Sequence, residues 1–187
     1  LHGCVLFNTL NLADKDVSLP VYILDDADAP GDKEIQLSVR AYNSELKLIR
    51  QEVFKAPRPA KKVHKAGEFA LSKEEVGTAP LFIVCDIVQD AKLMDRSFYW
   101  LNYENKRGCL FELPKTTLSY TKDQNRVVIK NTGNVPAFMV TVENPGHSDS
   151  FTSSDNYFWL EANETKEVTV NHPENIKVTC FNIEESQ

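Results

Sequence analysis

Adjacent acidic residues, which could supply a general acid and a general base, occur at three places in the sequence: Asp25-Asp26, Glu74-Glu75 and Glu184-Glu185. General acid–base catalysis needs both carboxyl groups within hydrogen-bonding reach of one substrate. On a β-strand, neighbouring side chains point to opposite faces, so adjacent acids do not converge on one substrate. We therefore expect solvated surface acids and assign no catalytic residue.

Histidine is the next residue type that could act as a base or a metal ligand. The four histidines are His2, His64, His147 and His172. None has the sequence spacing of a metal-binding pair. The chain also lacks a nucleophile elbow and a glycine-rich loop, so nothing points to a nucleophilic triad. We expect these histidines to be solvated residues of loops.

One acidic segment, residues 26–31, has aspartates at the first and third positions and glycine at the sixth, as a calcium-binding loop does. Its fifth position is Pro30, which offers no side-chain ligand, and its twelfth is Leu37 in place of glutamate. An acidic hairpin turn is therefore the favoured interpretation. The sequence predicts no metal site and no cofactor.

Exposed aromatic rings could bind a sugar by stacking. Two aromatic segments, residues 98–100 and 157–159, have the composition of β-strands. Because large aromatic residues dominate sandwich cores, we expect the outer two residues of the first segment and the middle residue of the second to point inward. On this pattern Tyr99, Tyr157 and Trp159 point away from the core. These three are the candidate ligand-binding residues, either stacking on glycan, facing solvent or packing against a neighbouring domain.

The four cysteines are too few for a disulfide scaffold, and none forms a CxxC motif. They are Cys4, Cys85, Cys109 and Cys180. Strand parity predicts that Cys85 and Cys180 are small buried residues. A bond between those two is disfavoured because they fall in different domains, and a Cys4–Cys85 bond stays an open alternative.

Composition narrows the function further. The chain has 187 residues and a net charge of −6. An acidic balance argues against nucleic acid or an anionic membrane as partners, since both favour a basic face. No run of 18 apolar residues occurs, so we expect no transmembrane helix. The start, Leu1-His2-Gly3-Cys4, has neither a basic region nor Met, so we expect no signal peptide and an excised piece of a longer protein.

The dominant hydrophobic period is two, which is typical of β-strands. Residues 34–42 alternate polar and apolar, as do residues 165–170 and 175–180. Residues 80–88 form the longest apolar run and are predicted to be a central strand. Helical signal is nearly absent, apart from a capping box at Ser72 and Glu75. Many short strands separated by turn signals predict an all-β fold of two tandem immunoglobulin-like antiparallel β-sandwiches.

The domain boundary is expected near residues 108–113, directly after a polar, unpatterned stretch at residues 102–108. About seven strands fit before residue 105 and about six after residue 114, and a seven-strand sandwich takes roughly 100 residues. We therefore predict one sandwich at residues 1–108 and a second at residues 109–187.

The second half contains a series of segments that resembles a known family. Leu113-Pro114-Lys115 opens it, Val135-Pro136-Ala137 begins a later strand, and Ser154-Asp155-Asn156-Tyr157-Phe158 begins another. This arrangement resembles the C-terminal sandwich of β-mannosidases and exo-β-glucosaminidases of glycoside hydrolase family 2. The first half resembles the preceding sandwich of those enzymes, mainly in its strand pattern. The sequence departs from the family at Glu161-Ala162-Asn163, where family members often have Pro-Gly.

The resemblance implies a non-catalytic C-terminal accessory fragment. The parent would be a retaining hydrolase of terminal β-mannosides or related β-glycosides whose catalytic glutamates lie on a (β/α)8 barrel. Since this chain has no βα alternation, no catalytic residue can be transferred to it. The implied partner is that barrel, and the implied location is the periplasm or the outside of a bacterial cell, or the animal lysosome. We interpret residues 154–158 as structural, because Asp and Asn favour the entry to a strand.

Two alternatives stay open. A carbohydrate-binding module would use exposed aromatic residues, and a tryptophan fluorescence titration with glycan would detect it. A cell-surface adhesion pair would use the same fold for an unrelated purpose.

Overall fold

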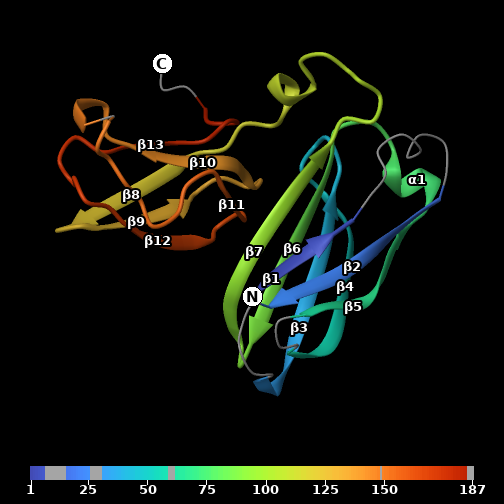
Figure 1. The fold of residues 1–187 in the computed structure, drawn as a ribbon. Helices are drawn as coiled ribbons and strands as arrows, with labels where there is room; N and C mark the ends of the chain where they lie inside the picture. The colour runs from blue at the N-terminus through green and yellow to red at the C-terminus, as the bar shows by residue number, and fades with distance from the viewer. Residues whose placement is uncertain (7–15, 26–30, 59–61, 148, 185–187) are drawn as a thin grey trace. The chain divides into compact units, whose positions relative to one another are not determined.

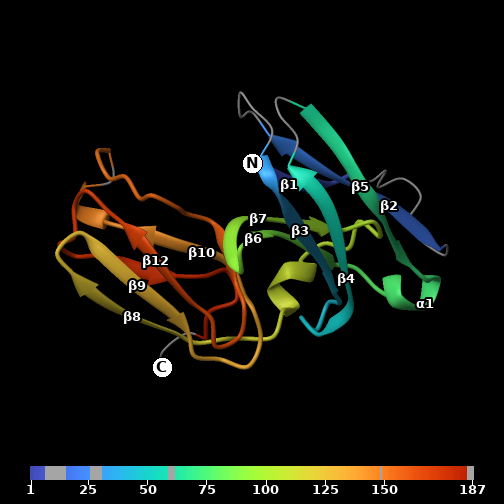
Figure 2. The ribbon, with the colours of Figure 1, turned by 90° about the horizontal axis from the view of Figure 1, so that it is seen from below.

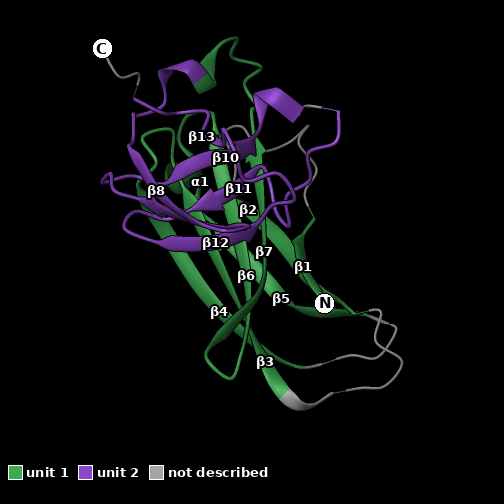
Figure 3. Cartoon of the chain, turned by 90° about the vertical axis from the view of Figure 1, so that its left-hand side faces the viewer, with its two compact units in different colours: residues 1–110 green, residues 111–187 purple. Residues whose placement is uncertain are grey.

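The computed structural model describes residues 1–6, 16–25, 31–58, 62–147 and 149–184. The chain divides into two compact units, residues 1–110 and 111–187 (Figure 3). Both units are built from antiparallel strands, and the helical elements of the described residues are short: α1 (Lys73–Val76), η2 (Cys109–Glu112) and η3 (Pro145–His147). The prediction of an all-β chain is confirmed.

The first unit is a sandwich of two sheets, visible as separate layers in Figures 1 and 2. The three-stranded sheet has the order β1 (His2–Val5), β2 (Val17–Asp25), β5 (Lys62–Leu71). The four-stranded sheet has the order β4 (Leu48–Arg58), β3 (Gly31–Tyr42), β6 (Leu81–Gln89), β7 (Lys92–Leu101).

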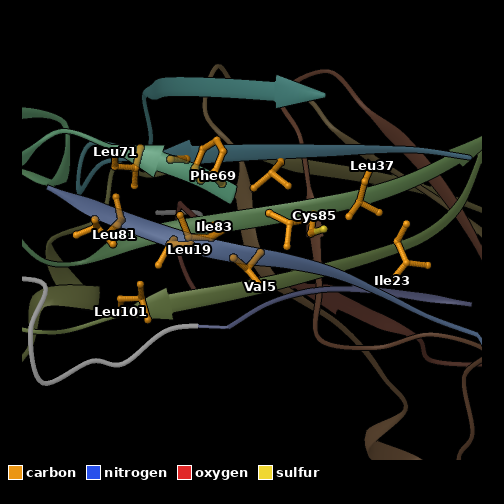
Figure 4. Packing of buried hydrophobic residues seen from close by; sticks show 14 of the residues in the cluster. Val5, Leu19, Ile23, Leu37, Phe69, Leu71, Leu81, Ile83, Cys85 and Leu101 are labelled. Carbon is orange, nitrogen blue, oxygen red and sulfur yellow. The ribbon is translucent and has the colours of Figure 1, made fainter. Parts of the chain in front are cut away.

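The core of the first unit lies between these sheets. Alternation in β3 buries every second residue completely: Ile35, Leu37, Val39 and Ala41. The opposing sheet contributes the side chains of Val5, Leu19, Ile23 and Phe69, which face those of β3 and β6 in Figure 4. Strict period-two burial is what a strand produces when one face packs on a core, so the pattern of β3 is explained by its place in the sandwich.

Strand β6 is buried on both faces, as expected of the longest apolar run. It lies between β3 and β7, and all residues from Leu81 to Ile87 are buried. Its one charged residue, Asp86, lies on the face opposite the core, between two arginines. Arg40 Nη2 of β3 lies 2.5 Å from Asp86 Oδ2, and Arg96 of β7 donates to both carboxylate oxygens at 2.7 and 2.9 Å. All three side chains are at most 13% exposed, so Asp86 is the counter-charge of two nearly buried guanidinium groups.

The turn between β5 and β6 contains the predicted capping box. The backbone N–H of Glu75 donates to Ser72 Oγ at 3.3 Å, and the backbone N–H of Ser72 donates to Glu75 Oε2 at 2.8 Å. These two bonds satisfy donors that the first turn of a helix leaves unpaired. The expectation for this segment is confirmed.

The second unit is a smaller sandwich of two three-stranded sheets. One has the order β12 (Thr165–Thr169), β9 (Arg126–Asn131), β8 (Leu118–Asp123), and the other β11 (Phe158–Leu160), β10 (Ala137–Glu143), β13 (Lys177–Thr179). Its core includes Val127, Ile129, Val140, Phe158 and Leu160.

Candidate functional site

Strand β7 has the opposite orientation from the one predicted. Tyr99 pairs with Ile83 and is partly buried against the first core. Burial is the largest cause that raises the pKa of its phenol. Trp100 pairs with Phe82 on the other face and is 43% exposed. The expected inward position of Trp100 and outward position of Tyr99 were therefore wrong, because β6 is apolar on both faces and either orientation of β7 finds an apolar neighbour.

Trp159 lies outside the core of the second unit, as the strand pattern predicted, but it is 1% exposed. Its indole meets Phe138 edge-on, with centroids 6.4 Å apart, and Nε1 donates to Glu161 Oε1 at 2.9 Å. The Phe138 ring in turn meets the Phe181 ring edge-on, with ring centroids 5.9 Å apart. A ring covered in this way presents no face to a sugar, so Trp159 is corrected from a candidate ligand-binding residue to a packed one.

Tyr157 is exposed, with 58% of its surface accessible. Its φ of +57° places it in the left-handed region, directly before β11 begins at Phe158. Because this residue is not extended, the alternation that would put it on the same face as Trp159 does not apply. Tyr157 and Trp159 therefore do not form a joint aromatic platform.

The segment Ser154–Phe158 has the structural role that was predicted. The amide of Asn156 accepts from the N–H of Val142 at 2.9 Å and donates to its C=O at 3.0 Å. Ser154 Oγ accepts from the N–H of Thr169 at 2.9 Å. Lys166 bonds Asp155 at 2.6 Å, and its ammonium lies 4.7 Å from the centroid of the Phe158 ring. These contacts tie the segment to β10 and β12.

Three glutamates, Glu45, Glu74 and Glu75, line part of one depression in the first unit, which has a volume of about 530 Å³. Glu75 is engaged by the Ser72 N–H and by Arg50 Nη1 at 3.1 Å. These contacts lower its pKa, with the backbone hydrogen bond from Ser72 as the largest cause. A general acid needs a raised pKa, so Glu75 is unsuited to that role.

Of the adjacent acids, Asp25 departs from expectation. It is 3% exposed at the end of β2, where the Leu1 amino nitrogen lies 3.9 Å from Oδ1. The expected surface position was therefore wrong for Asp25, while Glu74 and Glu184 are exposed as expected. Residues 26–30, which include most of the acidic segment compared with a calcium loop, lie outside the described residues.

All four cysteines are free thiols, and Cys85, Cys109 and Cys180 are buried. Burial is the largest cause that raises the pKa of Cys85, to about 12, and that of Cys180, to about 11. Since only the thiolate is nucleophilic, the thiolate fraction of Cys85 at pH 8 is on the order of one in ten thousand. Cys85 and Cys180 are therefore structural residues and not nucleophiles.

We therefore expect slow thiol modification of the native protein. Treatment with a disulfide reagent at pH 8 should modify at most one thiol quickly, that of the half-exposed Cys4, and all four after denaturation. Rapid release of three or four equivalents from the native protein would contradict the buried positions.

Three potential metal ligands meet in the second unit although the sequence did not indicate them. His147, His172 and Glu174 offer ligand atoms that all lie within 4.8 Å of one another. The two histidines are separated by 25 residues in sequence, too far for a spacing motif. The two loops that carry these residues become neighbours only when the strands pair, so the sequence contains no short signal for the cluster.

The fold and a family-model match together indicate the class of domain that the second unit resembles. Each unit is a two-sheet antiparallel sandwich, and residues 111–182 match the Ig_mannosidase family model, an Ig-fold domain. The second unit is therefore similar to the mannosidase-type Ig-fold domain over residues 111–182. The resemblance to an accessory β-sandwich of a family 2 glycoside hydrolase is confirmed by this match.

Solved structures share the fold over most or all of the chain. The exo-chitosanase CsxA of Amycolatopsis orientalis matches with a TM-score of 0.68 at 15% identity, over 89% of this chain and 24% of the enzyme. The β-D-mannosidase of Dictyoglomus thermophilum matches with a TM-score of 0.70 at 13% identity, over 100% of this chain and 22% of the enzyme. The chain thus spans about a quarter of the length of these structures.

No curated protein matches the sequence. Within the part of the chain that the structure describes, no helix has the length and apolar character needed to cross a membrane.

Proposed function

We propose that this chain is the non-catalytic C-terminal accessory region of a β-mannosidase-like glycoside hydrolase. The observation that carries the proposal is the match of residues 111–182 to the mannosidase-type Ig-fold domain. The parent would hydrolyse terminal β-mannosides or related β-glycosides, and it would work in the periplasm or outside a bacterial cell, or in the lysosome of an animal. The chain's own role is structural, and its partner is the catalytic barrel.

The described fold supports an accessory role on physical grounds. A retaining glycosidase holds two carboxyl groups about 5 Å apart across the scissile bond. In barrel enzymes these groups are placed at the C-terminal ends of parallel strands that alternate with helices. The sheets described here are antiparallel, and the longest helical elements among the described residues have four residues. Antiparallel sheets of this kind present flat outer faces on which another domain can pack, and they lack the ring of loops that carries the catalytic residues of a barrel.

The chain alone should not hydrolyse aryl β-mannoside or aryl β-glucosaminide, and it should be captured by the separately expressed catalytic barrel of its own gene product. Turnover above the buffer blank, or failure to bind that barrel, would contradict the accessory role. Passing the chain over insoluble mannan tests the carbohydrate-binding alternative. Retention that is lost in Tyr157→Ala would favour that alternative, because Tyr157 is the candidate with the most exposed ring.

A further inference from the structure

The loop that contains η3 and the loop that follows β12 are held side by side by two asparagines. The side chain of Asn144, which is 1% exposed, donates to the carbonyl oxygens of His172 and Glu174 at 3.0 and 2.5 Å. Its Oδ1 accepts from the N–H of Gly146 at 2.9 Å, so the same side chain also shapes the loop before His147. Asn171 bonds the backbone on both sides of Phe151, accepting from the N–H of Thr152 at 2.8 Å and donating to Ser150 O at 2.7 Å.

Strand β8 fixes the second loop from another side. Lys122 Nζ donates to Pro173 O at 2.8 Å, and Tyr120 Oη donates to Ile176 O at 2.9 Å. The carbonyl groups of Pro173, directly before Glu174, and of Ile176, two residues after it, are therefore both hydrogen-bonded. Preorganised loops lower the entropy cost of bringing ligand groups together, so the side chains that they carry are favourably placed for binding.

Three of those side chains converge. The rings of His147 and His172 stack with centroids 4.3 Å apart and an interplanar angle of 6°. Glu174 Oε1 lies 3.1 Å from His147 Nε2 and 3.5 Å from His172 Nδ1. Ligand atoms around tetrahedral zinc, at bond lengths of about 2.0–2.2 Å, are roughly 3.3–3.6 Å apart. Both carboxylate–imidazole distances are close to that separation before any ion binds.

We propose that His147, His172 and Glu174 form a binding site for a divalent transition metal ion, of which Zn²⁺ is the best match. Two imidazoles and one carboxylate are ligands that zinc accepts, and a water molecule completes the fourth position. The lone pairs of stacked rings lie in parallel planes, so the rings tilt apart when both nitrogens bind one ion. The side chains are 41%, 34% and 50% exposed, which leaves them free to tilt and leaves the ion a path from solvent.

Glu174 is the acidic member of the cluster, and its pKa is lowered, first by a hydrogen bond from its own backbone and then by His147 and His172. The ammonium group of Lys122, bonded to Pro173 O, is the charged neighbour contributed by β8. This site does not depend on the proposed function, because it needs only the second unit's own loops.

Calorimetric titration of the whole chain with ZnCl₂ tests the proposal. We expect one ion per chain, and affinity at least about tenfold weaker in Glu174→Gln, which corresponds to about 1.4 kcal/mol. Binding should be abolished in the double variant His147→Ala/His172→Ala. His64→Ala is the matched control, since this partly exposed histidine lies in β5, outside the cluster, and should not change the affinity.

Thermal unfolding supplies a second readout. An ion that binds only the folded state raises the unfolding temperature. Zinc should therefore raise that temperature in the parent chain and in His64→Ala, a chelator should reverse the rise, and Glu174→Gln should reduce it. Circular dichroism checks that the double variant is folded, and Glu174→Gln decides the question if it is not. Absence of saturable binding, or equal affinity in the parent and Glu174→Gln, would overturn the proposal.

Discussion

Asp86→Asn is expected to destabilise the first unit by about 3–5 kcal/mol, the usual cost of removing one partner from a buried ion pair. The substitution preserves the shape of the side chain but removes the charge that Arg40 and Arg96 share. Both guanidinium groups would then stay nearly buried without their carboxylate. Native-state hydrogen exchange of peptides from β3, β6 and β7 would measure the loss, as exchange faster by roughly two orders of magnitude or more.

An exposed pair of the same chemistry is the control for Asp86. Arg126 of β9 donates from Nε to Glu167 Oε1 of β12 at 2.9 Å, and its Nη2 bonds the other carboxylate oxygen. These side chains are 53% and 45% exposed. Glu167→Gln should leave the hydrogen-exchange protection of β9 and β12 nearly unchanged, since water screens a surface pair. Equal effects of the two substitutions would show that burial is not what makes Asp86 important.

Trp159→Ala is expected to cost the second unit about 3–5 kcal/mol, the range for deleting a large buried aromatic side chain. The change leaves a cavity beside Phe138 and removes the indole N–H that Glu161 accepts. Exchange protection of β10 and β11 peptides should fall, and circular dichroism should show whether the sandwich still forms at 25 °C.

Tyr157→Ala is the control for this second substitution because it removes an aromatic ring two residues away that is 58% exposed. Its effect on stability should stay within about 0.5 kcal/mol, as for most surface positions. Trp159→Phe should fall between the two, since it keeps a ring against Phe138 but lacks the indole donor. A large loss from Tyr157→Ala together with a small loss from Trp159→Ala would contradict the positions assigned to both rings.

The fold was predictable because hydrophobic alternation records which face of a strand is buried. It worked for β3, where Ile35, Leu37 and Val39 alternate with polar residues. It did not work for β7, where consecutive aromatic residues provide no polar contrast. The inward face of β7 is decided by its pairing with β6, a tertiary contact that the local sequence does not contain.

The candidate sites were predicted less well, for two physical reasons. Trp159 points away from the core as parity requires, yet parity does not show that Phe138 lies against it. His147 and His172 meet because Asn144 and Asn171 join two loops, and side-chain bonds between distant loops have no short sequence signature. The hydrophobic pattern therefore predicted the orientation of residues on strands with clear polar contrast, such as β3, and missed the contacts between distant loops.

The amide of Asn156 takes the place of one rung in a strand ladder. It offers a C=O and an N–H, the same two groups that a peptide unit would present to Val142. The backbone of β10 therefore stays satisfied at Val142, although its neighbour β11 has only three residues. Because the side-chain amide of Asn156 replaces this backbone pairing, the chain can turn out of the sheet at Tyr157 without leaving a buried peptide group unbonded. The Tyr157 ring is therefore exposed to solvent directly beside the buried residues of β11.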